Sequence, residues 1–234
     1  RPISNYPSDF ADLAVWLRAD SGVTFNIPTK RVSDWGDGSG NSNDVVQATV
    51  ANQPLRNGYD GQNDKSYFSF DGINDFMTSS NNSPITTDFT IFEVSRIDAV
   101  SNNVFGWNNG AASISIGTDA NGYVSTTVND GVASISTNTS VVNTLSSHIG
   151  VLKKHNKRID LEYYDSSNSI TTTDNDAAFD NTFSFNTAQF DIGSLNASQF
   201  LNGQLQEVII YNRALSTTEI ADIKGYLNLK YKIY

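Results

Sequence analysis

The stretch Gln206–Leu227, QEVIIYNRALSTTEIADIKGYL, decides how the chain is organised. It begins with a run of β-branched and aromatic residues, which is typical of a strand, and this run stops at Asn212. Ser216 is followed three residues later by Glu219, a capping box in which each side chain satisfies the other residue's free backbone N–H. We therefore predict a strand that leads directly into a helix.

The apolar residues of this ending fall at helical spacing. Leu215 and Ile220 occupy the two positions of a hydrophobic staple, which fixes the angle at which the chain enters a helix. Ile220, Ile223 and Leu227 then mark one apolar face. We expect this short C-terminal helix to lie against a β-sandwich and to cover an edge or an end of one sheet.

The rest of the chain is typical of short strands joined by tight turns. Alternation is clearest in DFTIFEVSRI (88–97), where Phe89, Ile91 and Glu93 share one face of a strand. Turn signals recur roughly every 8 to 12 residues, as in sandwich proteins. The further elements expected are a strand at 12–20 (DLAVWLRAD), a hairpin around Asp71–Asp75 (SYFSFDGINDFMTSS), turns at Asn108–Gly110, Asn121–Gly122 and Asp130–Gly131, and a long hairpin folded at His155–Asn156. Together they predict one all-β domain over residues 1–234, an antiparallel β-sandwich.

The composition disfavours several classes of function. The 234 residues carry a net charge of −10, which disfavours binding to nucleic acid or insertion into an anionic membrane surface. No segment reaches the ~20 apolar residues that span a bilayer. There is no cysteine, so disulfides, thiolate metal sites and cysteine nucleophiles are excluded. The chain begins at Arg1 rather than Met, so we expect a processed product or a domain excised from a larger protein, tethered to other domains.

Four stretches carry a resemblance to a known family: LAVWLRAD (13–20), VSDWGDGSGNSNDVVQ (32–47), SFDGINDFM (69–77) and the closing 201–231. With them, the sequence resembles the concanavalin A-like lectin/glucanase superfamily, in its laminin-G-like bacterial branch. The turn Tyr-Asn-Arg-Ala-Leu-Ser (211–216) into a short helix is the most specific match. The matched stretches bracket almost the whole chain in the family's order.

The resemblance implies a jelly roll of two antiparallel sheets that binds carbohydrate or protein ligands outside the cell; some members are glycanases. Members often hold a structural calcium ion, so a calcium ion is an expectation of the resemblance. The loop DWGDGSGNSND (34–44) is rich in oxygen ligands. It matches a calcium-binding loop only in its first half, and a network of Asx turns is the simpler interpretation. We assign no metal ligands.

The catalytic patterns of the superfamily are not found in the sequence. Glucanases place alternating carboxylates on one strand, and retaining hydrolysis needs two carboxyls about 5 to 5.5 Å apart. The nearest match, Asp160 and Glu162, lacks the third acid and belongs to a basic hairpin, KKHNKR (153–158), which we interpret as a solvated tip. Lyases of this fold use a tyrosine and a histidine, and neither His148 nor His155 stands in their motifs.

Sugar binding without chemistry needs aromatic faces that stack on sugar C–H groups, and amides or carboxylates that bond to hydroxyls. Such residues gather near three turns. The candidate ligand-binding residues are Trp107, Asn108 and Asn109 in GWNNG, Tyr59, Asp60 and Asn63 in NGYDGQND, and Tyr123 in NGYV. Burial in the core is the competing interpretation for Trp107, and packing at the start of a strand is the one for Tyr123.

We predict a non-catalytic carbohydrate-binding or adhesion module of a secreted or surface bacterial protein, with a polysaccharide or cell-surface glycan as its partner. The motifs report the fold, and fold alone does not settle function. Two alternatives stay open: a polysaccharide hydrolase or lyase of the same fold, and a protein-binding or spacer module such as an adhesin or phage tail-fibre domain.

Overall fold

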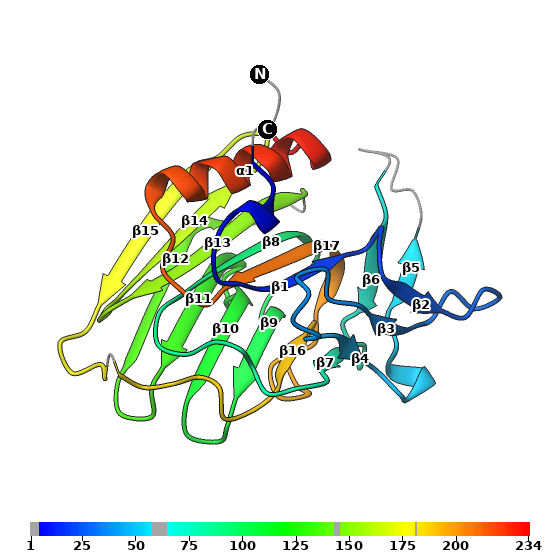
Figure 1. Ribbon diagram of the computed structural model, residues 1–234, viewed down its shortest axis with the longest axis horizontal. Coiled ribbons are helices and arrows are strands. Elements are labelled where there is room, and N and C mark those ends of the chain that lie inside the picture. The colour runs from blue at the N-terminus through cyan, green and yellow to red at the C-terminus, as the bar shows by residue number, and fades with distance from the viewer. Residues whose placement is uncertain (1–4, 58–64, 143–145, 181) are drawn as a thin grey trace.

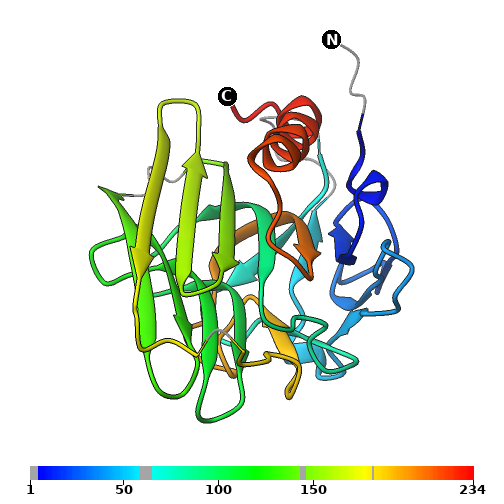
Figure 2. The ribbon, with the colours of Figure 1, turned by 60° about the vertical axis from the view of Figure 1, so that its left-hand side comes forward.

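Two β-sheets pack face to face, and one α-helix lies on the outer side of one of them (Figure 1, Figure 2). The computed structural model describes residues 5–57, 65–142, 146–180 and 182–234. In this part of the chain every strand pairs with its neighbours in the antiparallel sense. The antiparallel β-sandwich with a C-terminal helix that the sequence predicts is therefore confirmed.

We call the sheet beneath the helix the helix-side sheet and the other one the open sheet. In the described residues the helix-side sheet has eight strands: β1 (Leu13–Arg18), β5 (Leu55–Asn57), β6 (Tyr67–Asp71), β8 (Phe89–Ile97), β13 (His148–His155), β14 (Arg158–Tyr164), β15 (Ser169–Asn175) and β17 (Asn202–Tyr211). The open sheet there has nine: β2 (Val23–Phe25), β3 (Val32–Trp35), β4 (Val45–Val46), β7 (Met77–Ser79), β9 (Asn103–Asn108), β10 (Ser113–Thr118), β11 (Tyr123–Asn129), β12 (Ser134–Val142) and β16 (Phe190–Ile192). The helices are η1 (Pro7–Asp9), η2 (Val50–Asn52) and α1 (Thr217–Tyr231).

The central strands β8 and β17 of the helix-side sheet are buried on both faces. On β8, Phe89 and Ile91 point into the core between the sheets, whereas Phe92 and Val94 belong to the second core beneath the helix. This is the alternation that the sequence predicts. Glu93 lies on the inner face with Phe89 and is itself buried.

Helix α1 covers a face of the helix-side sheet, not an edge or an end of it (Figure 1, Figure 2). The predicted capping box is confirmed, because Ser216 and Glu219 each bond to the other's backbone N–H. Ile220, Ile223 and Leu227 are buried as predicted. Within the described residues no helix has the length and apolar character needed to cross a membrane.

A β-bulge in β17 sets the contact between strand and helix. The register against β8 shifts between Leu205 and Glu207, so two residues that would otherwise share a face point to opposite sides. Leu205 enters the core between the sheets, and Glu207 points beneath the helix.

The Glu207 carboxylate is fully buried and joins three parts of the chain. Its Oε1 accepts hydrogen bonds from Trp16 Nε1 (2.7 Å) and Tyr226 O–H (3.0 Å). Its Oε2 accepts from Tyr231 O–H (2.6 Å) and Lys230 Nζ (2.8 Å). Burial raises the pKa of both tyrosines, so they stay protonated donors. Four donors thus satisfy one charge that water does not reach.

Two expectations from the sequence are wrong. The segment around Asp71–Asp75 is not a hairpin, because β6 lies in the helix-side sheet and β7 in the open sheet. The chain crosses between the sheets there. The basic cluster is also not wholly a solvated tip: Lys154 is fully buried, where its Nζ bonds to Asp88 (3.1 Å) and lies over the Phe179 ring.

Candidate functional site: a polar pocket on the open sheet

A polar pocket lies on the outer side of the open sheet, where β16 pairs with β7 on one edge and β9 on the other. Its volume is about 320 Å³, within reach of the ~300 to 1,000 Å³ typical of small-ligand sites. The lining residues are Phe76, Thr78, Asn108, Ala188, Gln189, Asp191, Asn196 and Ala197. We call it the Asp191 pocket.

Strand alternation places the central pair of this pocket. On β16, Phe190 and Ile192 fill the core, so Asp191 between them points outward. Thr78 lies opposite Asp191 in the pairing of β7 with β16 and donates its hydroxyl to Asp191 Oδ1 at 2.7 Å. Two elements far apart in the sequence are thereby joined at the floor of the pocket.

The loop after β16 forms one wall. Asn196, Ala197 and Gln199 all have positive φ, of 52°, 50° and 49°. A left-handed backbone costs a residue with a side chain roughly 1 to 2 kcal/mol, and such strain concentrates at functional sites. The Ala197 N–H is held on Asp191 Oδ2 (3.3 Å), so this carboxylate fixes the loop that surrounds it.

Burial raises the pKa of Asp191 above the ordinary carboxyl value, while the bonds from Thr78, Ala197 and Ser194 oppose that rise. The side-chain amides of Asn108, Gln189 and Asn196 line the same pocket as the Asp191 carboxylate. In the described part of the chain no hydrogen bond engages the Nδ2 of Asn108, whose Oδ1 accepts the Gly110 N–H.

Phe76 supplies an apolar wall to the same pocket. It is half-buried, and its ring centroid lies 6.0 Å from that of Phe200. The pocket therefore combines an aromatic surface with a carboxylate, a hydroxyl and several amides. These are the groups that sugar rings require: an apolar face for C–H groups and acceptors and donors for hydroxyls.

The outer face of the open sheet continues from the pocket as a surface of short polar side chains. Cross-strand pairing aligns Asn108, Ser113, Asn129 and Ser134 in one row. The strands β9 to β12 contain no charged residue. This surface offers hydroxyls and amides to a ligand, without a cation to attract an anionic one.

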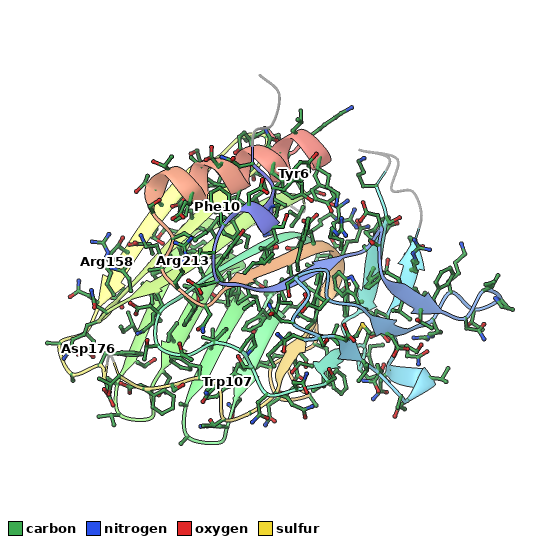
Figure 3. All side chains as sticks on the ribbon, viewed as in Figure 1. Tyr6, Phe10, Trp107, Arg158, Asp176 and Arg213 are labelled. Carbon is green, nitrogen blue, oxygen red and sulfur yellow. The ribbon has the colours of Figure 1, made fainter. Side chains whose placement is uncertain are left out.

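Of the predicted residues in GWNNG, only Asn108 lines the pocket. Trp107 is 1% exposed and packs in the core against Phe185, with its Nε1 bonded to Ala188 O (3.0 Å), so its interpretation as a stacking platform is corrected (Figure 3). Asn109 is exposed, but its side chain closes the turn and bonds to Thr187. Strand alternation explains the difference, because Trp107 and Asn108 point to opposite faces of β9.

The remaining predicted residues do not join this group. Tyr123 is half-buried at the other end of β11 from Asn129, about 20 Å away for six residues of extended strand. Tyr59, Asp60 and Asn63 lie outside the described residues, and their roles stay predictions.

The sequence reasoning missed most of the pocket, including Thr78, Gln189 and Asp191. One signal was present: in AQFDIG (188–193), Asp191 stands between two large apolar residues, the pattern of an outward carboxylate on a buried strand. Thr78 carries no comparable mark, because only its pairing with β16 brings it to the site.

Two groups of side chains resemble catalytic residues but lie away from the Asp191 pocket. His148 Nε2 lies 3.1 Å from Glu93 Oε1, and the His148 ring centroid is 4.8 Å from that of Tyr163. All three side chains are buried inside the sandwich. Asp160 bonds to Arg158, and Glu162 bonds to Lys224 (2.6 Å). His148 and Glu93 face each other inside the sandwich, Asp160 and Glu162 pair with basic side chains, and none of the four lines the Asp191 pocket.

The loop 34–44 does not fit a calcium ion. The Asp37 carboxylate accepts four protein donors: the backbone N–H groups of Trp16, Ser39 and Asn43 and the Ser39 hydroxyl. Asp44 Oδ1 accepts the Asp37 N–H. The bond from the Ser39 N–H to Asp37 is an Asx turn of the kind that the sequence suggests, and the other bonds tie the loop to itself and to β1. In the described ranges no three Asp, Glu, His or Cys side chains gather closely enough to hold a metal ion.

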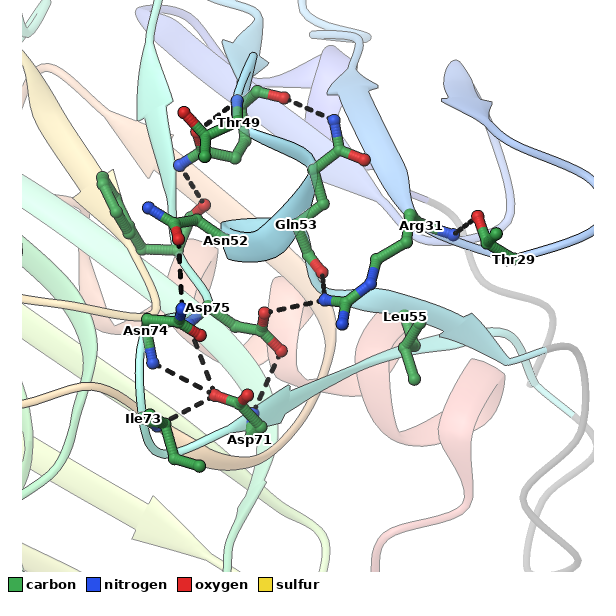
Figure 4. Close-up of polar contacts among 12 residues, drawn as sticks. Thr29, Arg31, Thr49, Asn52, Gln53, Leu55, Asp71, Ile73, Asn74 and Asp75 are labelled. Carbon is green, nitrogen blue, oxygen red and sulfur yellow. Dashed lines mark hydrogen bonds and ion pairs between the residues drawn. The ribbon is translucent and has the colours of Figure 1, made fainter.

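Another buried carboxylate, that of Asp75, lies where the chain crosses between the sheets (Figure 4). Its Oδ1 accepts a bond from Arg31 Nη1 (3.1 Å), its Oδ2 accepts the Asp71 N–H (3.2 Å), and its side chain is 3% exposed. Arg31 also bonds to the Gln53 carbonyl. Burial, and next the charge of Asp71, raise the pKa of Asp75 to about 6, against the opposing effect of Arg31.

This pKa predicts a pH dependence of stability. The folded state favours protonated Asp75, so its contribution is complete below the unfolded value of 3.8 and is lost as pH rises to about 6. We expect carboxyl ¹³C NMR to give a midpoint near 6 for Asp75, and the unfolding free energy to fall across that window. Asp75→Asn should remove this part of the pH profile. A midpoint near 3.8 would contradict the assignment.

No family model matches the sequence, and no curated protein matches it. Solved structures match it in fold. The binding domain of Paraclostridial Mosquitocidal Protein 1 aligns with a TM-score of 0.63 and 16% identity, over 95% of this chain and 54% of that one. Domain 4 of AbnA, a GH43 extracellular arabinanase from Geobacillus stearothermophilus in complex with arabinotriose, aligns with a TM-score of 0.65 and 12% identity, over 91% and 98%.

The LG1-3 region of the laminin alpha2 chain also aligns, with a TM-score of 0.51 and 14% identity, over 65% of this chain and 32% of that one. Identities this low show the fold alone. This chain spans about half the length of the mosquitocidal binding domain and a third of the laminin region. The concanavalin A-like, laminin-G-like fold expected from the sequence is confirmed.

Proposed function

We propose that this protein is a non-catalytic carbohydrate-binding or adhesion module that holds a neutral glycan in the Asp191 pocket. The observation that carries the proposal is the pocket itself, which joins the Phe76 wall to the Asp191 carboxylate and the Asn108 amide. The pocket is preorganised, because strand pairing and the bonded loop fix its polar groups before a ligand arrives.

The charge distribution favours a neutral ligand over an anionic one. The protein carries a net charge of −10, the pocket holds the half-buried carboxylate of Asp191, and the neighbouring strands β9 to β12 contain no cation. A uronate or sialic acid would meet repulsion there. The arabinotriose named with the structurally similar AbnA domain is a neutral saccharide and agrees with this choice.

We further propose that the module acts outside the cell, as part of a larger bacterial protein that it directs to a polysaccharide or a cell-surface glycan. The fold is shared with a domain of an extracellular arabinanase, which supports this setting.

Affinity gel electrophoresis tests the proposal. The gels contain linear arabinan, xylan or mixed-linkage β-glucan, with polygalacturonate as the anionic polymer. We expect at least one neutral polymer to retard the protein, and Asp191→Ala and Asn108→Ala to weaken binding roughly 10- to 100-fold, because each loses a hydrogen bond to the sugar.

Asn109→Ala is the matched control, since the adjacent amide bonds to Thr187 and does not line the pocket. Its affinity should equal that of the unmodified protein. Lack of retardation by every polymer would overturn the proposal and favour a protein-binding or spacer module. Release of reducing ends during the incubation would indicate a hydrolase.

A further inference from the structure

A second pocket lies on the opposite side of the sandwich, where the hairpin β14–β15 meets the segment that follows α1. Its volume is about 290 Å³. The lining residues are Tyr164, Asp165, Ser167, Asn168, Ser169 and Tyr234. Tyr164 packs against the core beneath the helix, whereas the Asp191 pocket opens on the open sheet. We call the second one the tyrosine pocket.

Two aromatic rings form the body of the tyrosine pocket. The ring centroids of Tyr164 and Tyr234 lie 5.6 Å apart with an interplanar angle of 37°. Tyr164 donates its hydroxyl to Glu162 Oε2 (2.8 Å) and accepts a bond from Lys224 Nζ (2.6 Å). The Lys224 ammonium also lies 3.9 Å from the Tyr164 ring centroid. This ring is therefore held in place from two sides.

Tyr234 is fixed through its backbone. Asn228 in α1 donates its Nδ2 to Tyr234 O (2.7 Å) and accepts the Tyr234 N–H on its Oδ1 (2.9 Å). The residue stays 52% exposed despite this anchoring. An anchored aromatic residue with half of its surface in water is a preorganised contact surface, since little entropy is lost when a ligand covers it.

Polar groups border the two rings. The Asp165 carboxylate accepts the N–H groups of Ser167 and Asn168 and the Tyr163 hydroxyl, which fixes the turn between β14 and β15. Among the described residues no hydrogen bond uses the hydroxyls of Ser167 or Ser169. The pocket thus offers a rigid turn with two hydroxyl groups beside two tyrosine rings.

We infer that the tyrosine pocket is a second saccharide-binding site, which stacks one sugar ring of a neutral glycan against Tyr164 and Tyr234. It shares the ligand class of the proposed function but none of the residues of the Asp191 pocket. Sites on opposite sides of one molecule can engage two glycan chains, or two segments of one chain. Binding to a polymer then exceeds binding to a short oligosaccharide through effective concentration.

Chemical-shift mapping of the ¹⁵N-labelled protein tests this inference, with arabinotriose, xylotriose and cellotriose as separate probes. We expect shifts at Ser167, Asn168 and Ser169 that saturate with probe concentration. They should persist in Asp191→Ala. Tyr234→Leu should weaken this response at least tenfold, because it removes an exposed aromatic face without opening the core.

Tyr6→Leu is the matched control, because Tyr6 is also 52% exposed and does not line the pocket. Tyr164→Phe keeps the ring and should retain binding within a few-fold. Shifts at the Asp191 pocket alone would overturn the second site and leave the proposed function standing. Shifts at the tyrosine pocket alone would support the second site and overturn binding at the Asp191 pocket. The inference would be overturned if no probe changed any chemical shift, or if Tyr234→Leu and Tyr6→Leu had equal effects.

Discussion

Replacing Glu207 with alanine is expected to lower the free energy of unfolding by about 3 to 5 kcal/mol, the range found when one partner of a buried ion pair is removed. The substitution leaves Lys230 without its nearest carboxylate and three further donors without an acceptor. Equilibrium unfolding in urea at neutral pH measures the loss. Hydrogen exchange should show that the amides of α1 lose protection before those of β8.

Two further variants distinguish the loss of the hydrogen bonds to Glu207 from the loss of one negative charge. Glu207→Gln keeps the shape and one acceptor, so its loss should be smaller than that of Glu207→Ala. Asp98→Ala removes a carboxylate that pairs with Arg96 at the surface, and such pairs contribute about 0 to 1 kcal/mol. A Glu207→Ala protein as stable as Asp98→Ala would show that the helix does not depend on this carboxylate.

Replacing Gly106 with alanine is expected to damage both stability and sugar binding. The added Cβ would lie 2.3 Å from Ser194 O and 2.7 Å from Leu195 Cα, which are backbone atoms of the loop that walls the Asp191 pocket. The loop must move outward, and overpacking of this kind costs about 1 to 3 kcal/mol. Because Asn196 and Ala197 move with it, we expect glycan retardation to weaken at least tenfold.

Gly225→Ala is the control for this substitution. Gly225 is exposed within α1, and an added Cβ would meet no atom within 4 Å beyond the neighbouring backbone of its own helix. Alanine should stabilise the helix by about 0.5 to 1 kcal/mol and leave binding unchanged. A Gly106→Ala protein that binds glycans like the unmodified protein would mean that the loop does not contribute to the pocket.

Local signals in the sequence predict much of the fold. The capping box at Ser216, the alternation of β8 and the turns at Asn121–Gly122 and Asp130–Gly131 each depend on neighbouring residues alone. The Asp71–Asp75 segment shows the limit. A tight turn looks the same whether the next strand returns to its own sheet or crosses to the other, and distant partners decide: β6 pairs with β17, and β7 with β16.

The candidate site was harder to predict for the same reason. Asn108 could be found because it stands at a turn, but Thr78 and Asp191 are 113 residues apart and meet only through strand pairing. Trp107 shows a second limit. A shift of one residue exchanges the buried and the outer face of a strand, so residue type alone did not reveal which of two neighbours would face the ligand.

The uncharged outer face of β9 to β12 gives this scaffold a practical use. Its serine, threonine and asparagine side chains are short, and the residues between them fill the interior. A combinatorial library at Ser113, Ser115 and Thr127 could therefore be selected for new sugars while the opposite surface of each strand keeps its packing. The residues that contact a ligand can then be changed independently of the residues that hold the two sheets together.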